Sequence, residues 1–128
     1  MEFLPEFLKQ YVVVREFNVE RDGKCISILF AFSEHACDEY GRVHGGCLAA
    51  LTTSLAEYLS RKHIESDEYI IVLSTSISFV KQLSCLEEAS LRTCIHRVGR
   101  VAVAESIVED RDGVPACRAY TSFVIEER

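Results

Sequence analysis

His44, Gly45 and Gly46 are the residues whose types and order are best suited to chemistry, because they open the longest helical pattern in the sequence. The first N–H groups of a helix have no partner inside the helix, and the helix dipole is positive at that end. Glycine leaves these groups accessible because it has no side chain. The pattern therefore indicates a site that binds a carbonyl oxygen as it gains negative charge. A plain tight turn explains the two glycines equally well.

Asp38, Thr53 and Glu57 are polar residues before and within this helical pattern that can interact with a water molecule. Asp38 lies six residues before His44. Thr53 and Glu57 are four residues apart, so they share one face of the helix. A carboxylate can act as a general base or a nucleophile at neutral pH, whereas a threonine hydroxyl can only orient water. Structural roles are the alternatives, since Asp38 can cap its own loop and Glu57 can pair with Arg61.

Two further side chains at the start of the helix have more than one interpretation. His44 can hydrogen-bond a bound substrate or hold the Asp38 carboxylate, and a histidine satisfied by backbone groups is the alternative. Cys47 lies in the first helical turn, where the pKa of a thiol can fall. Its apolar neighbours predict instead that the Cys47 side chain packs in the core.

The six cysteines contain no C-x2-C pair and no grouping with the four histidines that resembles a metal site. We therefore expect no metal. The N-terminal residues carry acids where a signal peptide has a positive segment, so we expect a cytoplasmic protein whose cysteines are reduced and buried. Disulfides of the kind found in intracellular proteins of thermophiles are the alternative.

The elements that position these residues begin with a hairpin. Large apolar side chains in residues 3–11 predict a short helix, and the β-branched and aromatic content of residues 11–20 predicts a strand. Asp22 and Gly23 follow, and residues 25–32 read as a second strand. An Asp-Gly pair between two strands favours a type I′ turn, so the two strands are expected to pair antiparallel.

Residues 45–63 form the long helical pattern, with an expected length of about 28 Å. Its large apolar residues recur at spacings of three and four, which predicts one buried stripe. The members of the stripe are Leu48, Leu51, Leu55, Tyr58 and Leu59. The small residues Gly45, Gly46, Ala49 and Ala50 are expected to let the first two turns approach a sheet closely.

Four more strands are predicted, over residues 69–80, 88–98, 100–109 and 114–125. One helix among about six strands joined by tight turns indicates an α+β fold, in which a curved antiparallel sheet wraps around one long central helix. A curved sheet leaves exposed edges, which a second copy of the chain commonly covers. We therefore expect a homodimer.

Length and composition limit the other possibilities. The 128 residues are 48% hydrophobic and contain no repeat, linker or low-complexity tract, so residues 1–128 are expected to form one domain. The net charge of -6 and the scattered lysines and arginines give no basic stripe for nucleic acid. No apolar segment reaches the roughly 20 residues of a membrane span.

The stretch from Gly41 to Leu51 resembles the G-x-x-H-G-G-x-x-x-x-L signature of the hotdog-fold acyl-CoA thioesterases, particularly their PaaI-like, phenylacetate-type branch. Four later segments resemble the same family in the same order. They are residues 76–81, 97–102, 110–116 and 119–123. The resemblance thus runs from about Gly41 to Phe123, which makes it far more specific than a lone His-Gly-Gly.

The resemblance implies a hotdog fold, a dimer or a dimer of dimers with active sites at the subunit interface, and hydrolysis of an acyl-CoA to a carboxylic acid and CoA. It assigns the N–H that polarises the carbonyl to Gly45 and a substrate contact to Gly46. Lys81, Arg97 and Arg100 resemble positions that hold CoA phosphates, and ordinary surface charge is the alternative for all three. No cofactor is implied beyond the CoA of the substrate.

Thr53 departs from the family pattern, because the catalytic Asp or Glu of these enzymes lies nine residues after the histidine. The departure leaves Asp38 or Glu57 to supply a carboxylate, with Thr53 helping to orient water. It also leaves open a hotdog dimer that binds acyl-CoA or acyl carriers without turning them over. A hydratase or dehydratase acting on enoyl or hydroxyacyl thioesters is a third interpretation, although the loop lacks the proline-rich motif of that branch.

Overall fold

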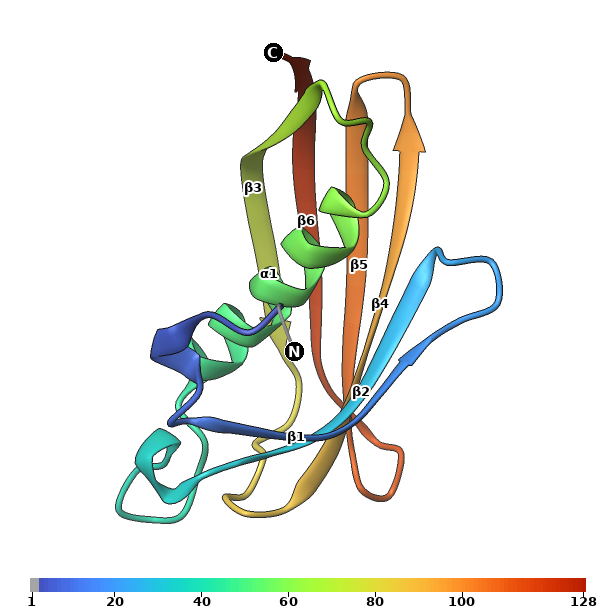
Figure 1. The fold of residues 1–128 in the computed structure, drawn as a ribbon. Helices are drawn as coiled ribbons and strands as arrows, with labels where there is room; N and C mark the ends of the chain where they lie inside the picture. Colours follow the sequence, from blue (N-terminus) through green and yellow to red (C-terminus); the bar gives the residue numbers. More distant parts are fainter. Residues whose placement is uncertain (1–2) are drawn as a thin grey trace.

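The strands of the computed structural model form one six-stranded antiparallel sheet, and helix α1 lies across one face of it (Figure 1). The structure describes residues 3–128. The strand order is β1-β2-β4-β5-β6-β3. In chain order the elements are η1 (Glu6–Leu8), β1 (Val12–Val19), β2 (Cys25–Phe32), η2 (Glu34–Ala36), α1 (Gly45–Arg61), β3 (Glu68–Phe79), β4 (Glu88–Val98), β5 (Val101–Asp110) and β6 (Pro115–Glu127).

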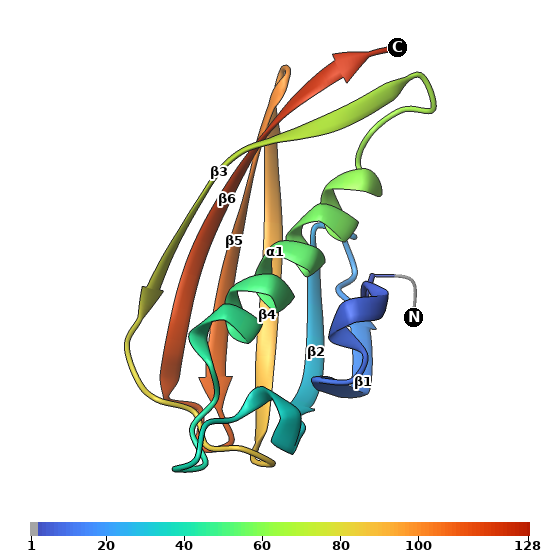
Figure 2. The ribbon, with the colours of Figure 1, turned by 90° about the vertical axis from the view of Figure 1, so that its left-hand side faces the viewer.

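The sheet curves around the helix. Figure 2 shows α1 between β3, β6 and β5 on one side and β1 and β2 on the other, with η1, in dark blue, on the same side as β1. The predicted stripe of α1 faces into this curve, where Leu48, Leu51, Leu55 and Leu59 are buried. Burying one such side chain contributes about 1.5 to 3 kcal/mol, so the stripe fixes the helix on the sheet. The α+β arrangement is therefore the one predicted.

The small residues of α1 do not all approach the sheet. A Cβ atom added to Gly45 would lie 3.3 Å from Cζ of Phe79, at the end of β3. A Cβ atom added to Gly46 would meet nothing within 4 Å. The expected close approach is therefore confirmed for Gly45 and wrong for Gly46, because successive helical residues point in different directions.

Two local predictions at the N-terminal end are wrong in detail. The expected N-terminal helix is the three-residue 3₁₀ helix η1. The hairpin of β1 and β2 is present, but its turn is not of type I′, because that type needs positive φ at both central positions. Gly23 has φ of 73°, whereas Asp22 does not have positive φ, and its Oδ1 accepts a hydrogen bond of 3.0 Å from the Lys24 N–H.

The prediction of reduced cysteines is wrong for four of the six. Cys25 is bonded to Cys94, and Cys37 is bonded to Cys85, while Cys47 and Cys117 are free. Cys25 and Cys94 are register partners on β2 and β4, with a Cα–Cα distance of 4.1 Å. The sequence does not reveal which strands become neighbours, so spacing alone cannot expose such a pair.

Strand β3 lies at one edge of the sheet and pairs antiparallel with β6 from Glu68 to Phe79. Large apolar side chains on it remain exposed, namely Tyr69, Ile71, Val72, Leu73 and Phe79. An edge with unpaired backbone groups and exposed apolar side chains is suited to pairing with another chain. Within residues 3–128, no helix is long and apolar enough to cross a membrane.

Candidate functional site

The start of α1 leaves two backbone donors open. His44 is the N-cap residue, with extended backbone at φ −65° and ψ 129°, and its side chain makes no capping hydrogen bond. Its carbonyl oxygen accepts the N–H of Cys47 at 3.1 Å. Among the residues that the structure describes, no acceptor meets the N–H of Gly45 or Gly46. These groups can therefore bind an external oxygen.

Backbone hydrogen bonds hold the chain that leads into the helix. The Val43 N–H donates to the Leu83 carbonyl at 3.0 Å, and the His44 N–H donates to the Ala36 carbonyl at 2.9 Å. The Gln82 side chain completes this arrangement, since its Nε2 donates to the Val43 carbonyl at 2.9 Å. The direction of the Gly45 N–H is thus set by segments on both sides of the helix start.

Two pockets flank the open donors. The first, which we call the Gly45 pocket, has a volume of about 240 Å³ and is lined by Val43, Gly45, Leu48, Phe79, Val80, Lys81, Gln82 and Leu83. The second, the Gly46 pocket, has a volume of about 350 Å³ and is lined by Phe7, Leu8, Tyr11, His35, His44, Gly46, Cys47 and Ala50. A ligand whose carbonyl meets the helix start can therefore extend into space on either side.

The Gly45 pocket carries the one lysine among the predicted CoA contacts. Lys81 donates a hydrogen bond to the buried carboxylate of Asp110, and the Asp110 side chain is only 1% exposed. Asp110 also accepts the N–H groups of Asp112 and Val114, both at 2.9 Å, in the turn before β6. The hydrogen bond between them raises the pKa of Lys81 and lowers the pKa of Asp110. Lys81 therefore stays cationic and is fixed at the rim.

The Gly46 pocket is mainly apolar, with aromatic side chains from η1 and the start of β1. Phe7 and Tyr11 line it together with His35 and His44. Cys47 also lines it, and burial raises the pKa of this thiol. The core-packing prediction for Cys47 thus fits better than an activated thiolate.

Both carboxylate oxygens of Asp38 accept hydrogen bonds within its own loop. Its Oδ1 accepts the N–H groups of Tyr40 and Arg42 at 2.9 and 3.0 Å, and its Oδ2 accepts Nε of Arg42 at 2.9 Å. The Arg42 N–H is the main reason that the pKa of Asp38 is lowered, with help from the Tyr40 N–H and the Arg42 guanidinium. These contacts match the loop-capping interpretation.

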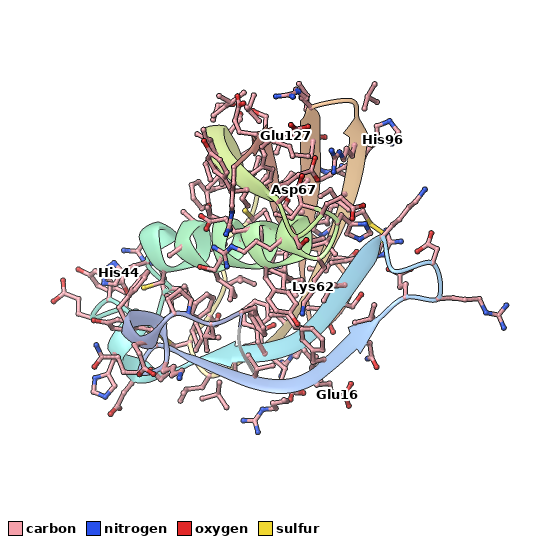
Figure 3. The ribbon with its side chains drawn as sticks, turned by 45° about the horizontal axis from the view of Figure 1, so that its top comes forward. Glu16, His44, Lys62, Asp67, His96 and Glu127 are labelled. Atoms are coloured by element: carbon pink, nitrogen blue, oxygen red, sulfur yellow. A yellow bond between two sulfur atoms is a disulfide. The ribbon has the colours of Figure 1, made fainter. Side chains whose placement is uncertain are left out.

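Thr53 and Glu57 lie far along α1 from the open donors. At 1.5 Å per residue, Thr53 is about 12 Å and Glu57 about 18 Å beyond Gly45 along the helix axis. Figure 3 labels His44 and Lys62, which lie at opposite ends of α1. Glu57 accepts a hydrogen bond of 2.8 Å from Arg61, as its spacing suggested, and its side chain remains 32% exposed. One chain therefore does not bring these residues to its own Gly45.

The two predicted CoA arginines lie near the other end of the helix. Arg97 donates to both oxygens of Glu68, at 3.2 and 3.0 Å, and to the His63 carbonyl at 3.1 Å. Arg100, in the turn before β5, donates to Glu126 at 3.3 Å. Of the sequence-predicted residues, His44, Gly45, Gly46 and Lys81 line the two pockets. Thr53, Glu57, Arg97 and Arg100 lie farther along or near the other end of the helix, and Asp38 stays in the loop before it.

Several residues at the site carried no assignment in the sequence analysis. They are Phe7, Tyr11, His35, Phe79, Gln82 and Asp110. Phe79 and Gln82 flank Lys81 in the segment after the helix, so their proximity to that lysine was the available signal. No sequence signal pointed to the residues of the Gly46 pocket, because η1 and η2 are too short to show a periodic pattern.

The curved sheet, the central helix and the glycines at its start define a hotdog-fold protein, as the resemblance predicted. A family profile described as "Thioesterase superfamily" matches residues 40–117, which is more than half of the 128 residues. The chain therefore belongs to the thioesterase superfamily. No curated protein sequence matches it.

Solved structures show the same fold at low sequence identity. A variant of a Pseudomonas aeruginosa thioesterase aligns with a TM-score of 0.78 at 20% identity, over 90% of this chain and 82% of that one. A Streptococcus mutans protein bound to acetyl-CoA aligns with a TM-score of 0.78 at 14% identity, over 100% and 97%. A hypothetical thioesterase of Streptococcus pneumoniae, solved with coenzyme A, aligns with a TM-score of 0.74 at 14% identity, over 91% and 87%.

Proposed function

We propose that the protein hydrolyses acyl-CoA thioesters to a carboxylic acid and CoA. The observation that carries the proposal is the open N–H of Gly45 at the start of α1, between two pockets. A carbonyl oxygen that accepts this N–H gains charge stabilisation as water attacks the carbonyl carbon and the C–S bond breaks. The water loses a proton, and the leaving thiolate takes one up.

The chemistry of the two pockets favours one orientation of the substrate. The Gly46 pocket is apolar and aromatic, which suits the acyl group. The Gly45 pocket offers the ammonium of Lys81 and the amide of Gln82, which suit the polar arm of CoA. Structural neighbours with coenzyme A and with acetyl-CoA support a ligand of this kind.

The carboxylate that directs water comes, in this proposal, from Glu57 of a second copy of the chain. All the contacts of Asp38 serve its own loop, whereas Glu57 has one bonded oxygen and one without a partner among residues 3–128. Its distance from Gly45 along the helix means that it can serve only the site of a neighbouring subunit. Thr53, one turn earlier on the same face, orients the water. Asp38 stays the alternative base.

A homodimer formed through β3 brings the two copies together. The exposed edge and apolar side chains of β3 suit antiparallel pairing with the same strand of a second copy, and such a contact is self-complementary. Light scattering during size-exclusion chromatography measures the mass directly. A dimer or a dimer of dimers is the expected species, and a monomer would leave Glu57 without a site to serve.

The substitution Gly45→Pro tests the role of the open Gly45 N–H. Proline lacks the N–H but is favoured at the first position of a helix, and the extended backbone of His44 suits a following proline. We expect hydrolysis of a panel of acyl-CoAs, followed by thiol detection, to fall roughly 10²- to 10³-fold. Gly45→Ala is the control, because it adds a Cβ beside Phe79 but keeps the donor.

Mixed dimers test whether Glu57 of one subunit serves the Gly45 site of the other. Glu57→Gln should lower turnover strongly, whereas Asp38→Asn should mainly loosen its loop. Inactive Gly45→Pro and Glu57→Gln proteins, unfolded and refolded together, should regain activity, since one site of each mixed dimer carries neither change. If no acyl-CoA is hydrolysed but calorimetry shows CoA binding, the protein is the non-catalytic binder instead.

A further inference from the structure

The Cys37–Cys85 disulfide lies where the chain that leads into α1 meets the connection between β3 and β4. Its Cα–Cα distance is 6.0 Å, within the range of ordinary disulfides. Cys37 follows η2 directly, and Cys85 lies just before β4. The bond therefore joins two irregular segments rather than two regular elements.

The segments that it joins also set the direction of the Gly45 N–H. Residues 37–43 form a small hairpin in which Cys37 is bridged to Val43, and Arg42 is bridged to Ser84. The Cys85 N–H donates to the Gly41 carbonyl at 2.8 Å. The peptide before Gly45 is thus held by a hairpin of few hydrogen bonds, and such segments open locally at small free-energy cost.

The Cys25–Cys94 disulfide provides the contrast. It links opposite residues of β2 and β4, which are already paired from Cys25 to Ala31. The sheet keeps its register there without the covalent bond. The two disulfides close comparable lengths of chain, 48 and 69 residues, so chain entropy predicts similar contributions to stability from both.

We propose that the Cys37–Cys85 disulfide is a positioning crosslink of the thioesterase site. It holds the segment before α1 against the β3–β4 connection and so fixes the Gly45 N–H where the carbonyl oxygen must lie. Cys37 and Cys85 are both only half-buried, which favours access by a small reductant. The inference rests on the proposed function, because it assigns the crosslink a role in turnover.

Reduction should therefore slow catalysis while the fold persists. One molecule of dithiothreitol supplies two electrons and two protons to the disulfide, which gives two thiols and the cyclic disulfide of the reagent. We expect kcat to fall at least tenfold and KM to change less than twofold, well below the melting temperature. Removal of the reductant and reoxidation by air should restore kcat.

Paired variants separate positioning from stability. Cys37→Ser/Cys85→Ser should show the low kcat without reductant and no further response to it. Cys25→Ser/Cys94→Ser should lose a similar amount of melting temperature, keep kcat within twofold of the wild type, and still respond to reductant. If the first variant does not fold, reduction of the folded Cys25→Ser/Cys94→Ser protein, which keeps the Cys37–Cys85 disulfide, gives the same comparison.

Hydrogen exchange gives a readout that needs no activity. Amides in residues 41–48 should exchange faster after reduction, whereas those in the last turn of α1 should not change. An unchanged kcat on reduction, equal exchange at both ends, or free thiols at Cys37 and Cys85 in protein purified without reductant would each overturn the proposal. Absence of hydrolysis on every acyl-CoA would refute the proposed function, and the exchange result would then decide the positioning role alone.

Discussion

The two ends of α1 differ in whether their backbone N–H groups form hydrogen bonds. At the N-terminal end, the N–H groups of Gly45 and Gly46 meet no acceptor in residues 3–128, and pockets lie on both sides. At the C-terminal end, the Lys62 and His63 N–H groups donate to the Leu59 and Ser60 carbonyls at 3.1 and 3.0 Å. His63 also contacts the Gly23 carbonyl through Nε2 at 2.7 Å.

This difference separates binding from stability. Backbone groups at helix ends are normally satisfied, so an unsatisfied end marks a place where a ligand can complete the hydrogen bonding. The basic residues Arg61 and Lys62 stabilise the satisfied end by facing the negative pole of the helix dipole. Changes at Leu59 to His63 should therefore mainly alter stability, whereas changes at Gly45 and Gly46 should also alter the site. Glu57, one turn before the C-terminal end, is the proposed exception.

The largest expected effect is on stability at the C-terminal end. Leu59 is 1% exposed and anchors the last turns of α1 on the sheet. Leu59→Ala should lower the free energy of unfolding by about 2 to 5 kcal/mol, as measured by chemical denaturation. Turnover per folded molecule should change far less than in Gly45→Pro. A comparable loss would show that the substitution also displaces Glu57, two residues earlier.

The next largest effect is the pH dependence of stability that the Lys81–Asp110 ion pair beside the Gly45 pocket should cause. The folded pKa of Asp110 is lowered by Lys81, so its contribution is present above the unfolded pKa of about 3.9 and is lost as pH falls through the folded value. Asp110→Asn should therefore melt several degrees below the wild type at pH 7. This difference in melting temperature should narrow as the pH falls below about 4. A difference that does not change with pH would contradict this account.

A smaller effect should come from backbone strain beside the Cys37–Cys85 crosslink. Leu86 has φ of 66°, in the left-handed region, and its side chain is 70% exposed. Leu86→Gly should raise the free energy of unfolding by about 1 kcal/mol, because glycine adopts this conformation without a Cβ clash. Leu86→Ala keeps the Cβ and should show no gain. A gain with alanine would mean that strain is not the cause.

The smallest effect should appear at the C-terminal end. The Ser60 hydroxyl is buried and has no hydrogen-bond partner within residues 3–128. Ser60→Ala removes this unsatisfied group, so thermal melting should show a stabilisation of up to about 1 kcal/mol. A destabilised Ser60→Ala protein would indicate that an ordered water satisfies the hydroxyl.

The elements were predictable because their signals are local. Residues 25–32 and 88–98 are strands at the predicted bounds, and the helix begins at the predicted Gly45. Alternating apolar residues and turn residues determine such elements within a few positions of the chain. The turn at Asp22 was less predictable, since several hairpin loops place glycine at a position of positive φ.

The pairings across the chain were not predictable in the same way. The Cys25–Cys94 disulfide depends on the register of β2 against β4, and the Gly46 pocket depends on η1 packing near α1. Neither leaves a periodic pattern in the sequence. The length of helix between Gly45 and Glu57 was available from the sequence, but the structure was needed to show that Asp38 is occupied by its own loop.

The donor at the centre of the proposed mechanism belongs to the backbone, so side-chain changes do not delete it. Every residue except proline keeps an N–H at position 45, and an alanine scan would pass over this group without removing it. The backbone donor of such a site can therefore persist while the position of the water-directing carboxylate changes. In the proposed mechanism the fold keeps the donor at Gly45, so the carboxylate can lie at Glu57 although Thr53 occupies the family's usual position.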